Sequence, residues 1–165
     1  MGLFDRIRNK KQETVYADTD IISVGAGEII PVVSVSDPMF AEQMMGPTVA
    51  YRLKDKTVKS PANGTIEVMF PTGHAFAVRM KDGTGLLIHI GIDTVNLKGK
   101  GFKVLMKQGD AVKAGQPVVQ VDRDVIRNAG YNTETMMVIT ETPDKNKEWK
   151  FAKPGPVEDG QIVAE

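Results

Sequence analysis

The chain has 165 residues, of which 41% are hydrophobic, and its 21 basic and 21 acidic residues give a formal net charge of zero. This length suits one compact domain, and the balanced charge argues against a nucleic-acid-binding protein. The sequence contains no cysteine, which excludes disulfides and thiolate metal sites and fits a cytoplasmic protein. It also has no apolar run of membrane-spanning length.

The first 20 residues are predicted to be a flexible N-terminal segment, followed by one domain over residues 21–165. Leu3, Phe4 and Ile7 share one face of a short helical pattern with basic residues around it. A weak contact of residues 1–11 with an anionic membrane surface would fit this pattern. A frayed terminus is the simpler interpretation of so short a segment.

Short valine- and isoleucine-rich runs follow from Ile21 onward, separated by turns that use many of the 16 glycines and nine prolines. This pattern predicts an all-β domain. One spacing of serine, glycine and isoleucine occurs twice, as Ser23, Gly27, Ile29 and as Ser60, Gly64, Ile66. The repeat suggests two similar β-motifs that pack together.

Two short helical segments interrupt the strands. Residues 37–46 are predicted to form one helical turn or a compact loop. Residues 124–129 are predicted to form a short helix with Asp124 as an acidic N-cap and Gly130 as the stop signal. We expect no chemistry from the residues after Lys98.

The chain has two histidines, His74 and His89, and the second lies in an almost unbroken apolar run. The dipeptide Asp82-Gly83 between them predicts a β-hairpin. A two-residue loop would place both histidines on the same face of the sheet, and a three-residue loop would separate them. We therefore expect a two-residue loop and neighbouring imidazole rings.

Neighbouring imidazoles suit three purposes. The first is phosphoryl transfer, in which one ring attacks phosphorus, the other hydrogen-bonds the transferring oxygens, and apolar neighbours such as Leu87 exclude water. The second is a zinc site, which would need a further ligand such as Asp37 or Asp93. The third is a pair of structural core histidines bonded to backbone carbonyls. The residue types alone leave all three open.

The run LLIHIGIDTVNLKGKGF at residues 86–102, preceded by Thr72-Gly73-His74, closely resembles the glucose-family enzyme IIA of the bacterial phosphoenolpyruvate-dependent sugar phosphotransferase system. The likeness extends to MGLFD at the start, to residues 37–42 and to SPANGTI at residues 60–66. It implies an antiparallel β-sandwich or barrel of repeated hybrid motifs with one or two short helical turns. It also implies a cytoplasmic phosphocarrier that requires no cofactor.

The resemblance assigns roles to individual residues. The family's histidine that matches His89 accepts phosphate on Nε2 from the histidine-containing phosphocarrier protein and passes it to a cysteine of an enzyme IIB domain. His74 would donate a hydrogen bond to the phosphoryl oxygens, and Thr72 would orient His74. Gly91 would accept a hydrogen bond from Nδ1 of His89. The acidic residues that flank the family's site are matched by Asp37 and Asp93.

An apolar ring for docking protein partners is also implied, formed by Phe40, Met44, Met45, Phe70, Leu87 and Val95. The methionines at 44 and 45 and the glycine at 73 depart from the family pattern and leave the preferred partner open. In some relatives zinc bridges both histidines to a regulated protein. A zinc ion at His74 and His89 is therefore expected only in such a partner complex.

Two other classes of protein remain as alternatives. A regulatory binding protein would dock partners on the same apolar face without being phosphorylated. A lipoyl- or biotinyl-type carrier would need a modified lysine at the tip of a hairpin, for which Lys56 is the candidate. Its glycine-turn motif would match residues 112–119.

Overall fold

The computed structural model describes residues 14–165, so the membrane contact predicted for residues 1–11 lies outside the described residues. Tyr16 donates a hydrogen bond to the carbonyl oxygen of Gly160 at 3.0 Å, and Asn63 donates one to the carbonyl oxygen of Tyr16 at 3.0 Å. These contacts attach the chain ahead of the first strand to two later turns. Among the described residues, no helix is both long enough and apolar enough to cross a membrane.

Strands make up most of the described chain, with two short α-helices and two 3₁₀ helices between them. In chain order the elements are β1 (Ile21–Ile22), β2 (Gly27–Ile30), η1 (Val32–Ser34), α2 (Pro38–Ala41), β3 (Thr48–Leu53), β4 (Thr57–Lys59), β5 (Gly64–Met69), β6 (Ala75–Met80), β7 (Gly85–Ile90), η2 (Thr94–Leu97), β8 (Phe102–Val104), β9 (Ala111–Val112), β10 (Pro117–Val121), α3 (Arg123–Asn128), β11 (Thr135–Glu141), β12 (Gly155–Val157) and β13 (Ile162–Ala164).

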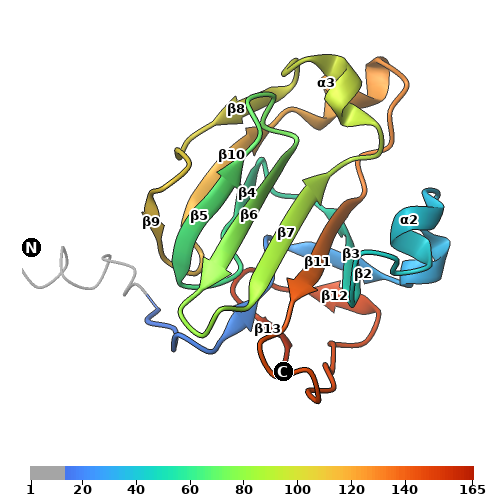
Figure 1. Cartoon of the computed structure of the whole chain (residues 1–165). Coiled ribbons are helices and arrows are strands. Elements are labelled where there is room, and N and C mark those ends of the chain that lie inside the picture. The colour runs from blue at the N-terminus through green and yellow to red at the C-terminus, as the bar shows by residue number, and fades with distance from the viewer. Residues whose placement is uncertain (1–13) are drawn as a thin grey trace, which may run out of the picture.

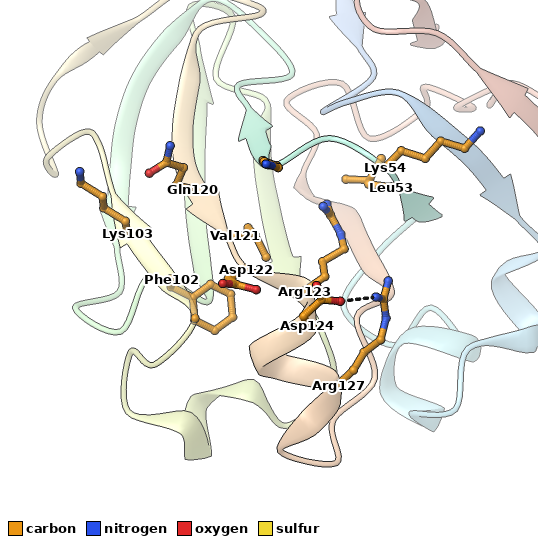
Figure 2. A pocket seen from close by; sticks show the side chains of 12 residues that line it. Leu53, Lys54, Phe102, Lys103, Gln120, Val121, Asp122, Arg123, Asp124 and Arg127 are labelled. Atoms are coloured by element: carbon orange, nitrogen blue, oxygen red, sulfur yellow. Dashed lines mark hydrogen bonds and ion pairs between the residues drawn. The ribbon is translucent and has the colours of Figure 1, made fainter.

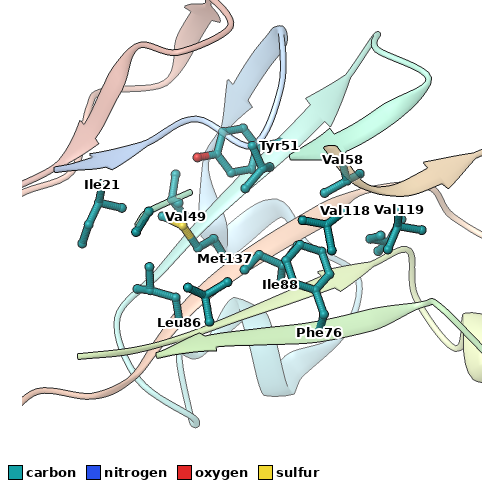
Figure 3. Close-up of a cluster of buried hydrophobic side chains, with 14 of the residues drawn as sticks. Ile21, Val49, Tyr51, Val58, Phe76, Leu86, Ile88, Val118, Val119 and Met137 are labelled. Carbon is teal, nitrogen blue, oxygen red and sulfur yellow. The ribbon is translucent and has the colours of Figure 1, made fainter. Parts of the chain in front are cut away.

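The strands form three antiparallel sheets (Figure 1). The largest has eight strands in the order β12-β2-β3-β11-β7-β6-β5-β9, a second has the order β4-β10-β8, and a third pairs β1 with β13. The main core lies between them: Val58 of β4 and Val118 of β10 belong to the same buried cluster as Phe76 and Ile88 of the large sheet (Figure 3). The predicted all-β antiparallel sandwich with short helical turns is confirmed.

Strand β7 lies between β6 and β11 in the large sheet and carries His89 near its end. Its alternate residues Leu86, Ile88 and Ile90 are buried in the main core. Leu87 instead packs against a smaller buried cluster that includes Phe40 of α2. Since successive side chains of a strand point to opposite faces, His89 shares the α2 side of the sheet with Leu87.

The hairpin between β6 and β7 has a three-residue loop, so the expected two-residue loop is wrong. Ala75 lies opposite His89, and the amide of Met80 donates to the carbonyl oxygen of Thr84 at 2.9 Å. Gly83 takes a φ of +95° as the third loop residue, a position that favours glycine. His74 nevertheless reaches His89, because it lies in the bend ahead of β6, where strict strand alternation does not apply.

The repeated serine–glycine spacing corresponds to a repeated local structure. The hydroxyl of Ser23 donates to the carbonyl oxygen of Gly25, and the hydroxyl of Ser60 donates in the same way two residues ahead, to Ala62. The two turns are joined directly, because the amide of Ile22 donates to the carbonyl oxygen of Pro61 at 2.8 Å. The predicted packing of two similar β-motifs is confirmed.

Both predicted helical segments are present, and one has a different N-cap. Asp37 caps α2 by accepting a hydrogen bond from the amide of Met39 at 2.9 Å. Helix α3 begins earlier than predicted, because Asp122 rather than Asp124 accepts from the amide of Val125. Asp122 and Asp124 are both residues that favour an N-cap, so the residue type alone does not decide between them.

Candidate functional site

The orientation of His89 is fixed by the backbone that follows it. The Nδ1 atom of His89 lies 2.8 Å from the carbonyl oxygen of Gly91. Because a carbonyl oxygen can only accept, Nδ1 carries the proton and Nε2 keeps its lone pair. The amide of Gly91 in turn donates to the carbonyl oxygen of Glu134 at 2.8 Å, so β11 anchors this turn.

The second imidazole lies beside the first. The ring centroids of His74 and His89 are 5.2 Å apart, and the ring planes meet at 78°. His74 is buried, with 4% of its surface exposed, and its Nδ1 lies 2.5 Å from Oγ1 of Thr72. Its carbonyl oxygen accepts from the amide of Ile90 at 2.7 Å. The structure therefore brings His74, Thr72 and His89 together as the sequence predicts.

Two aromatic rings flank the imidazoles. The ring centroid of Phe40 lies 5.0 Å from that of His89, and the ring centroid of Phe70 lies 5.1 Å from that of His74. Phe40 is 4% exposed and forms a wall of the site, whereas Phe70 is 40% exposed. The pair of histidines thus lies in an apolar surrounding in which His74 is buried and His89 is half-buried.

Burial keeps both imidazoles neutral at ordinary pH. It lowers the pKa of His74 to about 4, with a smaller contribution from the neighbouring His89. Burial also lowers the pKa of His89, while the carbonyl of Gly91 and the charges of Asp37 and Asp93 act in the opposite direction. A neutral imidazole with a free nitrogen is a nucleophile. The two acidic residues predicted to flank the site are therefore close enough to act on His89.

The residues of the predicted docking ring differ in exposure. Met44 and Val95 are among the most exposed apolar side chains, at 68% and 49%. Met45 and Leu87 are half-buried and pack against the small cluster beneath α2. Met39, which the sequence analysis did not name, is 47% exposed in the same helix. Among the exposed apolar residues, Phe70 borders His74, and Met39 lies in the same helix as Phe40, which borders His89.

The described residues supply two imidazoles for a metal ion. Within residues 14–165, no group of three or more histidine, cysteine, aspartate or glutamate side chains is placed to bind a metal. Because zinc takes four ligands as a rule, His74 and His89 would need ligands from another molecule. The predicted partner-bridged zinc site stays a prediction.

Residues from distant parts of the chain support the site and were missed in the sequence analysis. Met136 of β11 is the cross-strand neighbour of His89, and the backbone of Glu134 binds Gly91. Both residues lie after Lys98, in the part of the chain from which we expected no chemistry. The hydroxyl of Thr94 donates to the carbonyl oxygen of Ile90 at 2.5 Å. The Gly91–Val95 motif could have pointed to Thr94, whereas the pairing with β11 has no local signal.

Comparisons with known proteins identify relatives of this chain. The family model described as "phosphoenolpyruvate-dependent sugar phosphotransferase system, EIIA 1" matches residues 19–145. The glucose-specific EIICBA component of the phosphotransferase system from Streptococcus pneumoniae serotype 4 is 39% identical over 148 residues, which cover 88% of this chain and 20% of that protein. The corresponding component of Staphylococcus carnosus is 41% identical over 114 residues, which cover 69% and 17%.

A solved structure shares the fold. The glucose permease IIA from Mycoplasma capricolum matches with a TM-score of 0.82 and 32% identity over 88% of this chain and 93% of that one. The chain spans about a fifth of the length of the curated relatives that it matches. The family match and the shared fold confirm the resemblance seen in the sequence: this chain belongs to the EIIA 1 family of the phosphoenolpyruvate-dependent sugar phosphotransferase system and is a component of that system.

Proposed function

We propose that this domain carries a phosphoryl group on Nε2 of His89 in the cytoplasm, between the histidine-containing phosphocarrier protein and the cysteine of an enzyme IIB domain, for sugar uptake. The main support is the 2.8 Å contact between Nδ1 of His89 and the carbonyl oxygen of Gly91, which leaves Nε2 unprotonated. The relatives that are glucose-specific EIICBA components support an enzyme IIB partner.

Each transfer exchanges one bond to phosphorus for another. In the first step, the lone pair of Nε2 forms a nitrogen–phosphorus bond while the corresponding bond of the donor phosphohistidine breaks, and the electron pair returns to the donor imidazole. The Nδ1 proton stays in its hydrogen bond to Gly91. In the second step, the thiolate of the acceptor cysteine attacks phosphorus and the electron pair returns to Nε2.

His74 stabilises the charge of the transferring group in this proposal. When the hydroxyl of Thr72 donates to Nδ1 of His74, the imidazole carries its proton on Nε2. That N–H then donates to a phosphoryl oxygen bound at His89, whose ring centroid lies 5.2 Å away. Positioning and charge stabilisation are what phosphoryl transfer requires from a protein.

The apolar surroundings serve the relay in two ways. Phe40 and Phe70 flank the histidines and exclude water, which slows hydrolysis of the phosphohistidine. The exposed side chains of Met44, Phe70 and Val95 provide the surface on which the protein partners dock. Asp37 and Asp93 keep the nitrogen of His89 basic, because their charges raise its pKa against the effect of burial.

The two alternative classes have less support. A purely regulatory binding protein would use the same apolar face, but it would not need Nε2 of His89 to be unprotonated. A lipoyl- or biotinyl-type carrier would present Lys56 at the tip of a hairpin. However, β3 pairs with β2 and β11 while β4 pairs with β10, so the segment that contains Lys56 connects two sheets.

Phosphorylation by purified components tests the proposal. The chain is incubated with phosphoenolpyruvate, the general transfer enzyme and the histidine-containing phosphocarrier protein, and the bound phosphate is measured by intact mass. We expect one acid-labile phosphate, which His89→Gln abolishes. His74→Gln should accept phosphate but transfer it to an enzyme IIB domain at least about tenfold more slowly, because a donor to the phosphoryl oxygens is lost.

Threonine variants provide a matched control for the positioning of His74. Thr72→Val removes the hydroxyl beside Nδ1 of His74 and should slow transfer, whereas Thr65→Val changes an exposed position of β5 and should not. Phosphate that remains on the His89→Gln variant, or equal transfer rates for both threonine variants, would contradict the assigned roles.

A further inference from the structure

A cavity of about 790 Å³ lies apart from the histidines and shares no residue with their site. It is open to solvent and is lined by α3, by the end of β10, by β8 and by the segment that follows β3 (Figure 2). Small-molecule sites in proteins usually have volumes of about 300–1,000 Å³. The phosphoryl relay makes no use of this cavity.

Basic side chains outnumber acidic ones around the cavity. Its basic residues are Lys54, Lys56, Lys103, Arg123 and Arg127, and its acidic residues are Asp122 and Asp124. Both acids have partners, because Asp124 pairs with Arg127 at 3.3 Å and Asp122 accepts a hydrogen bond from the amide of Val125 at 3.2 Å. The cavity therefore carries an excess of positive charge in a chain whose net charge is zero.

Arg123 is the most constrained of these cations. Its Nη1 donates to the carbonyl oxygen of Asp55, whereas its Nη2 is buried and has no hydrogen-bond partner among residues 14–165. A buried donor without an acceptor is unfavourable, so the Arg123 side chain would gain from an anion held near its guanidinium group.

The guanidinium group of Arg127, next to that of Arg123, also favours an anionic ligand in the cavity. Arg123 and Arg127 extend from α3 in the same direction, whereas Lys54 extends away from them (Figure 2). Burial and the charge of Arg127 both lower the pKa of Arg123, while the charge of Asp55 acts in the opposite direction. A bound anion would offset the repulsion between the two guanidinium groups, and guanidinium groups match phosphate oxygens in geometry.

The apolar residues of the cavity indicate which kind of anion would fit it. Phe102, Val121 and Leu53 contribute apolar surface next to the charged groups. Such a wall suits a ligand with an organic part as well as a charged one. A long polyanion such as nucleic acid is disfavoured, because the chain as a whole has no net positive charge to attract it.

We propose that this cavity binds a small phosphate monoester, with the guanidinium groups of Arg123 and Arg127 facing its phosphoryl oxygens and the side chains of Phe102 and Val121 against its organic part. The site is independent of phosphorylation at His89, so it stands or falls separately from the proposed relay. Inorganic phosphate shares the charged group but lacks the organic part.

Titrations followed by amide NMR shifts test this site. Inorganic phosphate, glycerol phosphate and phenyl phosphate are each added to the unphosphorylated protein at constant ionic strength, with chloride as the reference anion. We expect saturable shifts at Gly101, Phe102 and Arg123, with phenyl phosphate binding more tightly than inorganic phosphate. The same shifts should appear in the His89→Gln variant.

Three variants that each remove one positive charge distinguish binding at this site from a general electrostatic effect. Arg123→Gln should weaken binding by about tenfold or more, because a charge-assisted hydrogen bond is lost. Arg127→Gln changes an exposed residue and should weaken it by a smaller factor, which keeps the test valid if Arg123→Gln does not fold. Lys153→Gln, at an exposed position outside the cavity, should leave binding unchanged.

Three results would overturn the proposal. The first is that chloride produces the same shifts as the phosphate compounds. The second is that the shifts occur only around His74 and His89 and disappear in His89→Gln. The third is that Arg127→Gln and Lys153→Gln weaken binding equally.

Discussion

Gly91 connects the backbone of the domain to the imidazole ring of His89. Its carbonyl oxygen accepts from Nδ1 of His89, and its amide donates to Glu134. Its φ of +80° lies in the left-handed region, where side chains are disfavoured. A Cβ at this position would lie 2.4 Å from Cγ2 of Thr94 and 2.8 Å from the carbonyl oxygen of Asn132. Only glycine fits here without movement of its neighbours.

Gly91→Ala should therefore affect both stability and phosphorylation. Backbone strain should reduce the free energy of unfolding by about 1–3 kcal/mol, and displacement of the carbonyl should slow phosphorylation of His89. The measurements are urea denaturation and the initial rate of phosphate incorporation. Gly130→Ala is the control, because Gly130 has a φ of +90° with nothing within 4 Å of the added Cβ. It should lower stability alone, and a Gly91→Ala variant that is phosphorylated at the unaltered rate would refute this role.

At the scale of single elements, α2 is a turn of four residues whose position depends on one capping side chain. Asp37 accepts from the amide of Met39, and the same short helix places Phe40 against His89. The charge of Asp37 also raises the pKa of His89. Capping and charge are therefore two separable contributions from one residue.

Two substitutions at Asp37 distinguish these contributions. Asp37→Ala removes the cap and should reduce the free energy of unfolding by about 1 kcal/mol. Asp37→Asn keeps an acceptor for the amide of Met39 but loses the charge, so it should preserve stability and lower the pKa of His89 further. NMR titration of the His89 ring measures that pKa. An unchanged pKa in the Asp37→Asn variant would show that the charge does not act on the ring.

The identity of these elements could be predicted from the sequence, and their register could not. The Asp82-Gly83 dipeptide identified the hairpin that carries the histidines, and residues 37–46 were expected to form one helical turn or a compact loop. The predicted loop of two residues was wrong. The side chain of Asp82 accepts a hydrogen bond from the amide of Thr84 at 2.9 Å, which favours a loop of three residues. The predicted pairing of the histidines holds despite this error, because the turn at Pro71 and Gly73 leads into a bend at His74 that brings its ring beside His89.

At the scale of the whole molecule, acid should destabilise the fold through its buried imidazoles. The pKa of His74 is about 4 in the folded protein and about 6.5 for an unperturbed histidine. Between these values the unfolded chain binds more protons than the folded one. Stability is therefore complete above about pH 6.5 and decreases as the pH falls toward about 4, and the lowered pKa of His89 acts in the same direction.

Urea denaturation of the wild type and of His74→Gln at about pH 7 and about pH 4.5 measures this effect. The wild type should lose more stability between the two values than the variant, because glutamine cannot be protonated. The carboxylates titrate in both proteins and cancel in the comparison. An equal loss in both proteins would mean that His74 is not held in its neutral form.

The fold class and the paired histidines could be predicted because each has a local signal, namely short β-branched runs and a specific motif. The supporting residues could not, because their contacts are made by pairing across the sheet. Met136 and Glu134 lie more than forty positions from His89 and reach it only through β11. The cavity beside α3 depends likewise on three separate segments that no single stretch of sequence brings together.

The pairing of β1 with β13 brings the first and last strands of the described chain side by side. In Figure 1 these strands lie at the lower end of the molecule, whereas β7 runs upward and carries His89 close to its upper end. A tether that pulls on β1 or on β13 would thus act on the edge remote from the imidazoles. Such a tether would leave the end of the domain that carries His89 free to meet another protein.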